Sequence, residues 1–436
     1  MGNFKINSFV RILIGGVVIL MLGGLVGWYF YLRSQSAAIN TVSAGRSLGS
    51  AIPSFGSPTG STQANQAIAT QSFGPNGQMT NAAASSSSPL WEVDQAPVAG
   101  MGFVDTATDE YLYYVERANG YIFSAHPSAR TITRLTDTLT PKIYEAQFTN
   151  DGSFIERSLD SAGNVTTFLG ALATTTGAMN SGQTASSSAN AGTAASASPF
   201  QNIVGVFLDP NIQAIALDHS SGAIFYLVAD PHGGVDGISM QWNGTKKQTV
   251  FSSIVGSWDP SVLDDGTIIL LESPADGLPG YAYSLGTAGA LKPLVRGVPG
   301  LTVLTKTSSP LLLYGSSSGR GLTLTGMASS TPQVIPLSTI ADKCVWLPGN
   351  SEIAYCAVPN GTIANNFIDS WYMGLAHTSD DWWKIDLSTG ATQRIYSPSA
   401  DNISIDVADP TIDASGNYIT FINATDQSLW VFHVAQ

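Results

Sequence analysis

A tight polar turn followed by a short apolar strand recurs seven times in this chain, and this recurrence limits the fold more than any other feature. The copies read ATDEYLYYV, NDGSFIERS, SSGAIFYLV, DDGTIILLE, SSPLLLYGS, GNSEIAYCA and SGNYITFIN. Four of the six intervals between successive turns are 42 to 44 residues, and the other two are about 70 and about 65. Each long interval contains an insertion, at 174–198 and at 359–381. The underlying period is therefore near 43 residues.

A period in this range, with one four-stranded unit per repeat, is typical of a β-propeller. We therefore predict an all-β fold, a seven-bladed β-propeller over residues 89–436, although the count leaves six or eight blades open. The last unit ends after its third strand, and the segment 89–93 precedes the first complete unit with no other assignment. We predict that this segment supplies the missing outer strand and closes the ring.

The N-terminus carries a membrane signal. Residues Ile12–Leu32 are 21 uncharged, mostly apolar residues, enough for a helix to cross a bilayer. Lys5 and Arg11 precede them, which favours a cytoplasmic segment 1–11 and a propeller outside the membrane, in the periplasm or the extracellular space. The alternative is a cleaved signal peptide, whose apolar core is ordinarily shorter. We predict a single-pass protein of the cell membrane.

Gly23 and Gly27 form a GxxxG pair inside this apolar run. The spacing lets two membrane helices approach closely and predicts self-association, but glycine is also common in membrane helices without that role.

Two tracts lack any hydrophobic periodicity. Residues 33–88 consist mainly of Ser, Ala, Gly, Thr, Gln and Asn, and between Ser34 and Ser88 the only charge is Arg46. Such a composition cannot bury enough apolar surface to fold, so we predict a flexible linker. The insertion 174–198 has the same composition and falls between a third and a fourth strand, so it should leave the face opposite to the connections between blades.

Charge excludes some functions. The net charge is −13 and only 11% of residues are charged. Nucleic acid needs clustered Lys and Arg against its phosphates, so we expect no nucleic-acid partner. The sequence has no P-loop, no GxGxxG in a fitting context and no HExxH, and we expect no cofactor and no metal.

The two cysteines, Cys344 and Cys356, lie symmetrically about Asn350 in a predicted hairpin. Symmetric positions face each other across an antiparallel pair, at a separation that suits a disulfide. We predict that bond, with two buried free thiols as the alternative.

The insertion 359–381 is the candidate partner surface because it is rich in aromatic residues and opens on the face that carries the connections between blades. The candidate residues are Phe367, Trp371, Tyr372, Met373, His377, Asp380, Asp381 and Trp382. Aromatic residues and Met are typical of binding hot spots. The alternative is a small packed cap, since an insertion needs its own core, and Trp382 also begins a strand.

Acidic residues recur near the inner strands, where they would line a channel that binds a cation or would serve as ordinary turn residues. They are Asp105, Asp218, Asp259, Asp264, Asp265, Asp406 and Asp409.

The turns TNDGSFI, LDDGTII, LPGNSEIAY and DASGNYITFI resemble the WD40-like repeats of TolB-type propellers, over about residues 97–436. This resemblance implies a binding or scaffolding domain, often of the cell envelope, and carries no catalytic residues. We predict a non-catalytic, membrane-tethered binding or scaffolding module whose partner is another envelope protein or a surface glycan. Two alternatives stay open: an envelope hydrolase or lyase that acts on glycan or peptide at the channel mouth, and a structural surface protein.

Overall fold

The computed structural model describes residues 78–79, 88–106, 109–173, 200–286, 289–306, 311–319, 321–328, 331–349 and 351–434. The chain divides into two units, Met1–Ala44 and Gly45–Gln436, and every described residue belongs to the second. The predicted membrane helix 12–32 and the insertion 174–198 lie outside the described residues. No helix within these ranges is long and apolar enough to cross a membrane.

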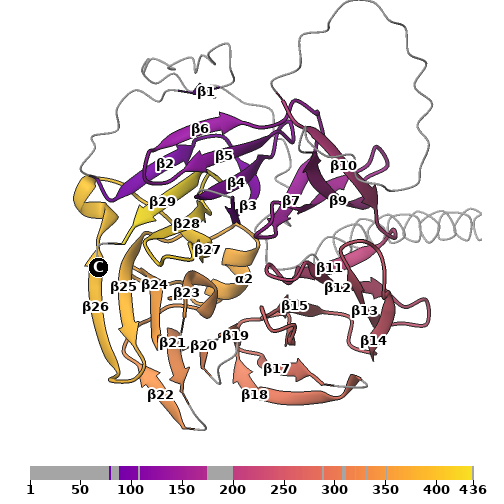
Figure 1. Ribbon diagram of the computed structural model, residues 1–436. Helices are drawn as coiled ribbons and strands as arrows, with labels where there is room; N and C mark the ends of the chain where they lie inside the picture. Colours follow the sequence, from indigo (N-terminus) through magenta and orange to yellow (C-terminus); the bar gives the residue numbers. More distant parts are fainter. Residues whose placement is uncertain are drawn as a thin grey trace, which may run out of the picture. The chain divides into compact units, whose positions relative to one another are not determined.

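The described residues form seven antiparallel sheets around a common centre, which confirms the seven-bladed β-propeller (Figure 1). The strands of the first four blades, from the innermost outward, are β3 (Val98–Asp105), β4 (Glu110–Glu116), β5 (Ile122–His126) and β6 (Thr131–Arg134); β7 (Ile143–Phe148), β8 (Phe154–Leu159), β9 (Val165–Ala173) and β10 (Asn202–Phe207); β11 (Ile212–Leu217), β12 (Ala223–Ala229), β13 (Val235–Gln241) and β14 (Gln248–Ser253); and β15 (Trp258–Val262), β16 (Ile268–Glu272), β17 (Pro279–Leu285) and β18 (Leu291–Pro299).

The last three blades follow the same order. Their strands are β19 (Thr302–Thr305), β20 (Leu312–Ser318), β21 (Gly321–Met327) and β22 (Pro332–Ile335); β23 (Cys344–Trp346), β24 (Ile353–Pro359), β25 (Asp380–Asp386) and β26 (Ala391–Tyr396); and β27 (Val407–Ile412), β28 (Tyr418–Asn423), β29 (Leu429–His433) and β2 (Leu90–Asp94). The short helices are η3 (Ala341–Lys343), α2 (Phe367–Tyr372) and η4 (Pro398–Asp401).

The recurring turns set the start of each second strand. Gly152, Gly266 and Gly416 have φ angles of 83°, 78° and 75°, a left-handed conformation that glycine adopts without a steric cost. In two of these turns the Asp directly before the glycine accepts a hydrogen bond from the backbone after it: Ser153 N donates to Asp151 Oδ1 at 3.0 Å, and Thr267 N donates to Asp265 Oδ1 at 2.9 Å. Turn chemistry therefore explains why the sequence repeat and the structural repeat coincide.

The hydrophobic core is divided among the interfaces between neighbouring blades. Seven buried clusters each draw side chains from two adjacent sheets, one cluster for every interface of the ring. One example packs Phe154 of β8 against Val115 and Ile122 of the preceding blade. Each sheet is thus apolar on both faces, which accounts for strands that read as continuous apolar runs.

The ring closes through the first strand of the folded region, as predicted. β2 pairs antiparallel with β29, with Leu90 opposite Phe432 and Trp91 opposite Val431. Leu90, Trp91 and Val93 are buried in the clusters on the two sides of the last blade.

Two residues of the predicted linker 33–88 pair with the first blade, which the sequence did not predict. β1 (Gln78–Met79) lies antiparallel to β6 and extends the first blade to five strands. An outer strand presents unpaired N–H and C=O groups, and these accept a passing extended segment without any requirement on its side chains.

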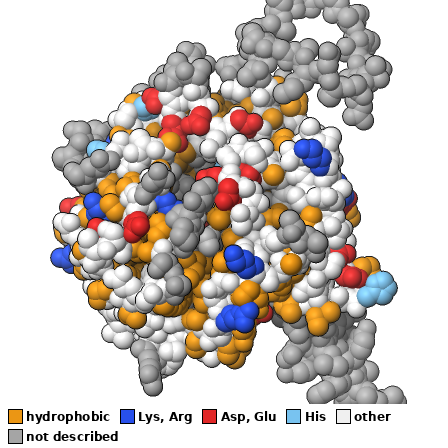
Figure 2. All heavy atoms as spheres, turned by 60° about the horizontal axis from the view of Figure 1, so that its bottom comes forward, with side chains coloured by type: hydrophobic (Ala, Val, Ile, Leu, Met, Phe, Trp, Pro, Cys, Tyr) orange, Lys and Arg blue, Asp and Glu red, His pale blue; other side chains and the backbone are white. Residues whose placement is uncertain are grey.

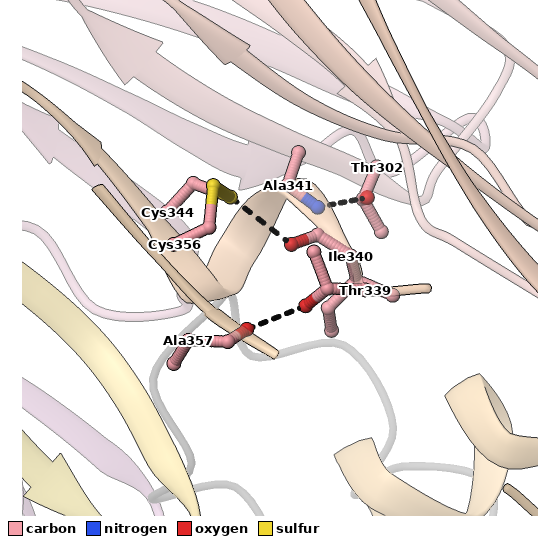
Figure 3. Close-up of a disulfide and its surroundings, with 7 residues drawn as sticks. All are labelled: Thr302, Thr339, Ile340, Ala341, Cys344, Cys356 and Ala357. Atoms are coloured by element: carbon pink, nitrogen blue, oxygen red, sulfur yellow. Dashed lines mark hydrogen bonds between the residues drawn. A yellow bond between two sulfur atoms is a disulfide. The ribbon is translucent and has the colours of Figure 1, made fainter. Parts of the chain in front are cut away.

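The predicted disulfide joins Cys344 and Cys356, which face each other in the β23–β24 pair with their Cα atoms 4.0 Å apart. Figure 3 shows two hydrogen bonds that fix the segment 339–341, which leads into β23. The Thr339 hydroxyl donates to the Ala357 carbonyl (2.7 Å), and Ala341 N donates to the Thr302 hydroxyl (2.9 Å). Both cysteines are buried between the fifth and sixth blades, so the bond fixes an inner strand rather than a surface loop.

Candidate functional site

The insertion between β24 and β25 folds into a cap built around α2, an element that the sequence did not predict. Phe367, Ile368 and Trp371 of α2 are buried and form one cluster with residues of the fifth and seventh blades, among them Leu322 and Ala408. Figure 1 places α2 near the inner strands, close to the β23 and β27 labels. The insertion therefore carries its own core and shares it with its neighbours.

Polar contacts connect the cap with the fourth blade and with η3. Asp276 N, in the β16–β17 connection, donates to Asp369 Oδ1 of α2 at 2.9 Å. The Tyr372 hydroxyl donates to the carboxylate of Asp342 in η3. The cap thus links the sixth blade to the fourth on a single face of the propeller.

A fully buried charge cluster lies beneath the cap. Lys343 Nζ donates to Asp380 Oδ2 at 2.6 Å, to Asp406 Oδ1 at 2.5 Å and to the Thr378 hydroxyl at 3.0 Å. The side chains of the lysine and both aspartates are 0% exposed. Trp371 Nε1 also donates to Asp406 Oδ1, at 2.9 Å, and so connects the cluster to the cap.

The two carboxylates respond differently to burial. Burial raises the pKa of Asp380, and the charge of Asp406 adds to this, although Lys343 acts in the opposite direction. Burial also acts to raise the pKa of Asp406, but Lys343, Trp371 and Thr378 together hold it below its usual range. The cluster therefore keeps Asp406 ionised inside the protein, in a position where neither it nor Lys343 reaches solvent.

His377 contacts the buried cluster and is itself exposed to solvent. Its Nδ1 lies 3.1 Å from Asp406 Oδ2, and its side chain is 37% exposed. A histidine held by a buried carboxylate is an arrangement that serves general acid–base chemistry when a substrate binds beside it. A cleft of about 360 Å³, lined in part by Asp265 and Lys306, lies elsewhere, between the fourth and fifth blades, and shares no residue with the cluster.

Most of the residues predicted to form a partner surface lie in the interior. Phe367, Trp371, Asp380, Asp381 and Trp382 are buried, Tyr372 is half-buried, and only Met373 and His377 are exposed. This placement matches the alternative of a packed cap, because the aromatic side chains provide the core of the insertion and of its blade. For example, the ring of Trp382 stacks on that of Phe432 in the seventh blade, 5.4 Å between centroids. The two aspartates accept hydrogen bonds instead, Asp380 from Lys343 and Asp381 from the Ser397 hydroxyl (2.7 Å).

The acidic residues near the inner strands do not form a common site. Asp218 Oδ1 accepts hydrogen bonds from the backbone N–H groups of Ser220 (2.9 Å) and Ser221 (3.0 Å), a turn role. Asp406 belongs to the charge cluster. Within the described ranges no group of three His, Cys, Asp or Glu residues is arranged to hold a metal ion.

Sequence reasoning missed a set of exposed apolar side chains. They lie in connections between successive blades or between a second and a third strand, which emerge on one face, here called the connector face. They are Leu139, Ile254, Val255, Leu278, Met373 and Leu375. On the opposite face the described turns contain no large exposed hydrophobic residue, and Leu291, 37% exposed, borders one of these turns as the first residue of β18. An apolar residue in a connection rich in Gly, Ser or Asp was the signal in the sequence that could have identified them.

Charged side chains lie scattered over the view in Figure 2.

No family model matches the sequence, and no curated protein matches it. Among solved structures, the chain is similar to YCF48 from Cyanidioschyzon merolae, with a TM-score of 0.49 and 10% identity over 79% of this chain and 98% of that one. It is also similar to a streptogramin B lyase (TM-score 0.46, 10% identity, 79% and 97% covered). A third structure is an oligogalacturonate lyase in complex with manganese (TM-score 0.44, 8% identity, 78% and 97% covered). The neighbours are β-propeller proteins, and the likeness is one of fold.

Proposed function

We propose that this protein is a non-catalytic binding or scaffolding module of the cell envelope, and that its partner docks on the connector face. The observation that carries the proposal is the collection of exposed apolar side chains on that face. Ile254 is 94% exposed and Leu375 is 75% exposed, and the opposite face has no counterpart in the described turns. Exposed large apolar side chains are typical of the surfaces through which proteins bind one another.

The arrangement of the face suits such a contact. The cap fixes the loop that carries Met373 and Leu375, because Trp371 and Phe367 beside them are buried. Leu278 follows Asp276, the residue that α2 binds through Asp369. Burying one such leucine against a partner contributes about 1.5 to 3 kcal/mol. A micromolar interaction corresponds to about −8 kcal/mol after the costs of association, so the contact requires several of these side chains together.

Location forms a second part of the proposal. Residues 12–32 would anchor the chain with residues 1–11 in the cytoplasm, and the linker would carry the propeller into the periplasm or extracellular space. The Cys344–Cys356 disulfide supports this placement because such bonds persist in oxidising compartments. The resemblance of the turns to those of TolB-type propellers also supports a location in the cell envelope.

The test compares the partners that the full-length chain captures from its own envelope extract with those of the double variant Leu278→Glu and Leu375→Glu. We expect the variant to lose the partner that the natural chain retains. The matched control is Val334→Glu, an exposed valine on the outer strand β22, which should leave capture unchanged. Thermal melts establish that all three chains fold alike. Identical partner sets for the natural chain and the double variant would refute the connector face as the binding surface.

A second candidate function is an envelope hydrolase or lyase acting on glycan or peptide. The specific observation in its favour is His377, exposed and held by the buried, ionised Asp406. Its test measures turnover of envelope glycans and peptides by the natural chain and by His377→Ala. Loss of turnover with unchanged partner capture would favour the enzyme over the binding module. If the natural chain shows no turnover of these substrates, the enzymatic function is refuted.

A further inference from the structure

The outer strand of the second blade, β10, differs from the other outer strands of the ring. Its six residues, NIVGVF, contain no charge and no proline. Three large apolar side chains on it are exposed: Val204 at 49%, Val206 at 57% and Phe207 at 71%. An edge strand with these properties is a template for pairing with another strand.

The remaining outer strands carry features that protect an edge. Each has a charged residue or a proline within it or immediately before it. These residues are Arg134 in β6, Lys247 before β14, Lys292 and Pro293 in β18, Pro332 in β22, Arg394 in β26, and Glu92 and Asp94 in β2. The unprotected edge is thus a property of one blade and not of the fold.

The backbone of β10 has a regular set of groups that point outward. Leu208 N donates to Thr167 O at 2.9 Å, in the same register that pairs Phe207 with Phe168 and Asn202 with Ala173. Because hydrogen-bonded pairs alternate along an antiparallel ladder, Ile203, Gly205 and Phe207 direct their N–H and C=O groups away from β9. In the described part of the chain these outward groups have no partner.

The propeller already accepts a strand at such an edge. β1 pairs with the outer strand β6 of the neighbouring blade through Gln78 and Met79. Strand addition at the rim is therefore compatible with the geometry of these blades.

We propose that β10 pairs antiparallel with β10 of a second copy of this chain, about a two-fold axis at Gly205. The strand is self-complementary around this residue: valines flank Gly205 on both sides, and Ile203 and Phe207 lie beyond them. The axis places Gly205 opposite Gly205, Ile203 opposite Phe207, and Val204 opposite Val206. The outward N–H and C=O groups then meet each other, and the pairs on either side of the central glycine, from Ile203 to Phe207, are apolar.

A second copy fits this edge better than an unrelated segment. A two-fold contact uses the same patch twice, and the pattern of β10 has that symmetry. The strand brings no like charges together, although each chain carries a net charge of −13. Phe207 is held in place by Phe168, 5.1 Å between ring centroids, so it is presented in a fixed position. Cross-strand apolar pairs contribute roughly 0.2 to 1 kcal/mol each.

The contact is small. Six residues a side bury less than the roughly 800 Å² per partner of a standard interface, so free propellers should pair weakly. The inference is independent of the proposed partner on the connector face, because β10 lies on the rim.

The first experiment measures self-association of the full-length chain in detergent micelles by sedimentation velocity. We expect a concentration-dependent dimer that Val206→Lys weakens by at least tenfold, since two lysines would then face apolar side chains across the axis. Val334→Lys is the matched control, an exposed valine on the outer strand β22, and should associate like the natural chain. All chains carry Gly23→Ile and Gly27→Ile, which removes the predicted contact between membrane helices. A dimer that then survives Val206→Lys unchanged, or no dimer at the highest concentration, would overturn the proposal.

The second experiment tests the register. The chain's only cysteines form the Cys344–Cys356 disulfide, so an introduced cysteine is the free thiol. Chains with Val204→Cys mixed with chains with Val206→Cys should form a reducible cross-linked dimer, because these positions form a close non-hydrogen-bonded pair. Val334→Cys mixed with Val206→Cys should not. Equal cross-linking in both mixtures, or cross-linking of Val206→Cys in cells only to a different protein, would refute the two-fold pairing.

Discussion

A single buried carboxylate should make this protein less stable as the pH rises through neutrality. Glu156 of β8 is 3% exposed and, by the alternation of side chains along a strand, lies on the same face as Phe154, between the first and second blades. Its Oε1 has no hydrogen-bond partner within the described ranges. Burial raises the pKa of Glu156 from 4.5 to about 7. The perturbation is Glu156→Gln, which keeps the shape and removes the ionisation.

The sign follows from linkage. The folded state holds this proton more tightly than the unfolded state, so the stabilisation is present below pH 4.5 and is lost as the pH rises through about 7. A shift of this size corresponds to about 3 kcal/mol when the folded group is fully ionised, and to ~2.5 kcal/mol between pH 5 and pH 8. The variant should lose this dependence.

The assay is urea unfolding followed by tryptophan fluorescence at pH 5 and pH 8, at constant ionic strength. The quantity compared is the change in unfolding free energy between the two pH values, which cancels any packing cost of the amide. Asp94, whose pKa burial raises to about 6, leaves a residual slope in the variant. Asp137→Asn, an exposed carboxylate, is the control and should behave as the natural chain. An equal loss of stability in Glu156→Gln and in the natural chain would refute the reasoning.

Three further perturbations have directions that the structure sets. Removing residues 89–95 should lower the melting temperature by many degrees, because the buried side chains of β2 contribute about 5 kcal/mol or more; an unchanged melt in a calorimeter would disprove closure by this strand. Replacing Cys344 and Cys356 by Ala should cost about 3 kcal/mol in urea unfolding, from the chain entropy of a short loop, and reduction of the natural chain should reproduce the loss. Lys343→Met should destabilise the fold by ~3 to 5 kcal/mol, because two buried carboxylates lose their counter-charge. Adding Asp406→Asn to that variant should recover part of the lost stability. A further loss of stability would contradict the ion pair between Lys343 and Asp406.

The features predicted from sequence depend on local chemistry. The turn glycines such as Gly152 and Gly266 mark where each second strand begins, so the blades and their number could be predicted from the spacing of the turns. The facing of Cys344 and Cys356 also followed, because a hairpin fixes which residues are opposite. In each case a few neighbouring residues determine the outcome.

The features that escaped prediction depend on contacts between distant residues. Lys343 reads as a surface charge until Asp380 and Asp406 are brought around it by two different blades. The aromatic residues of the insertion were compatible with a partner surface and with a packed cap, and the packing of Leu322 and Ala408 with Phe367 and Trp371 decides for the cap. No local pattern distinguishes a buried aromatic cap from an exposed one.

The closing strand imposes an order on the making of the protein. β2 is among the first parts of the domain to leave the ribosome, but its partner β29 is the last of the strands in the described residues. During synthesis β2 must therefore wait, with Trp91 and Leu90 uncovered, while six blades form. The last step of folding joins the two ends of the domain and carries a large loop-closure entropy. A nascent chain of this kind should spend most of its folding time as an open ring that a chaperone or a protease can recognise.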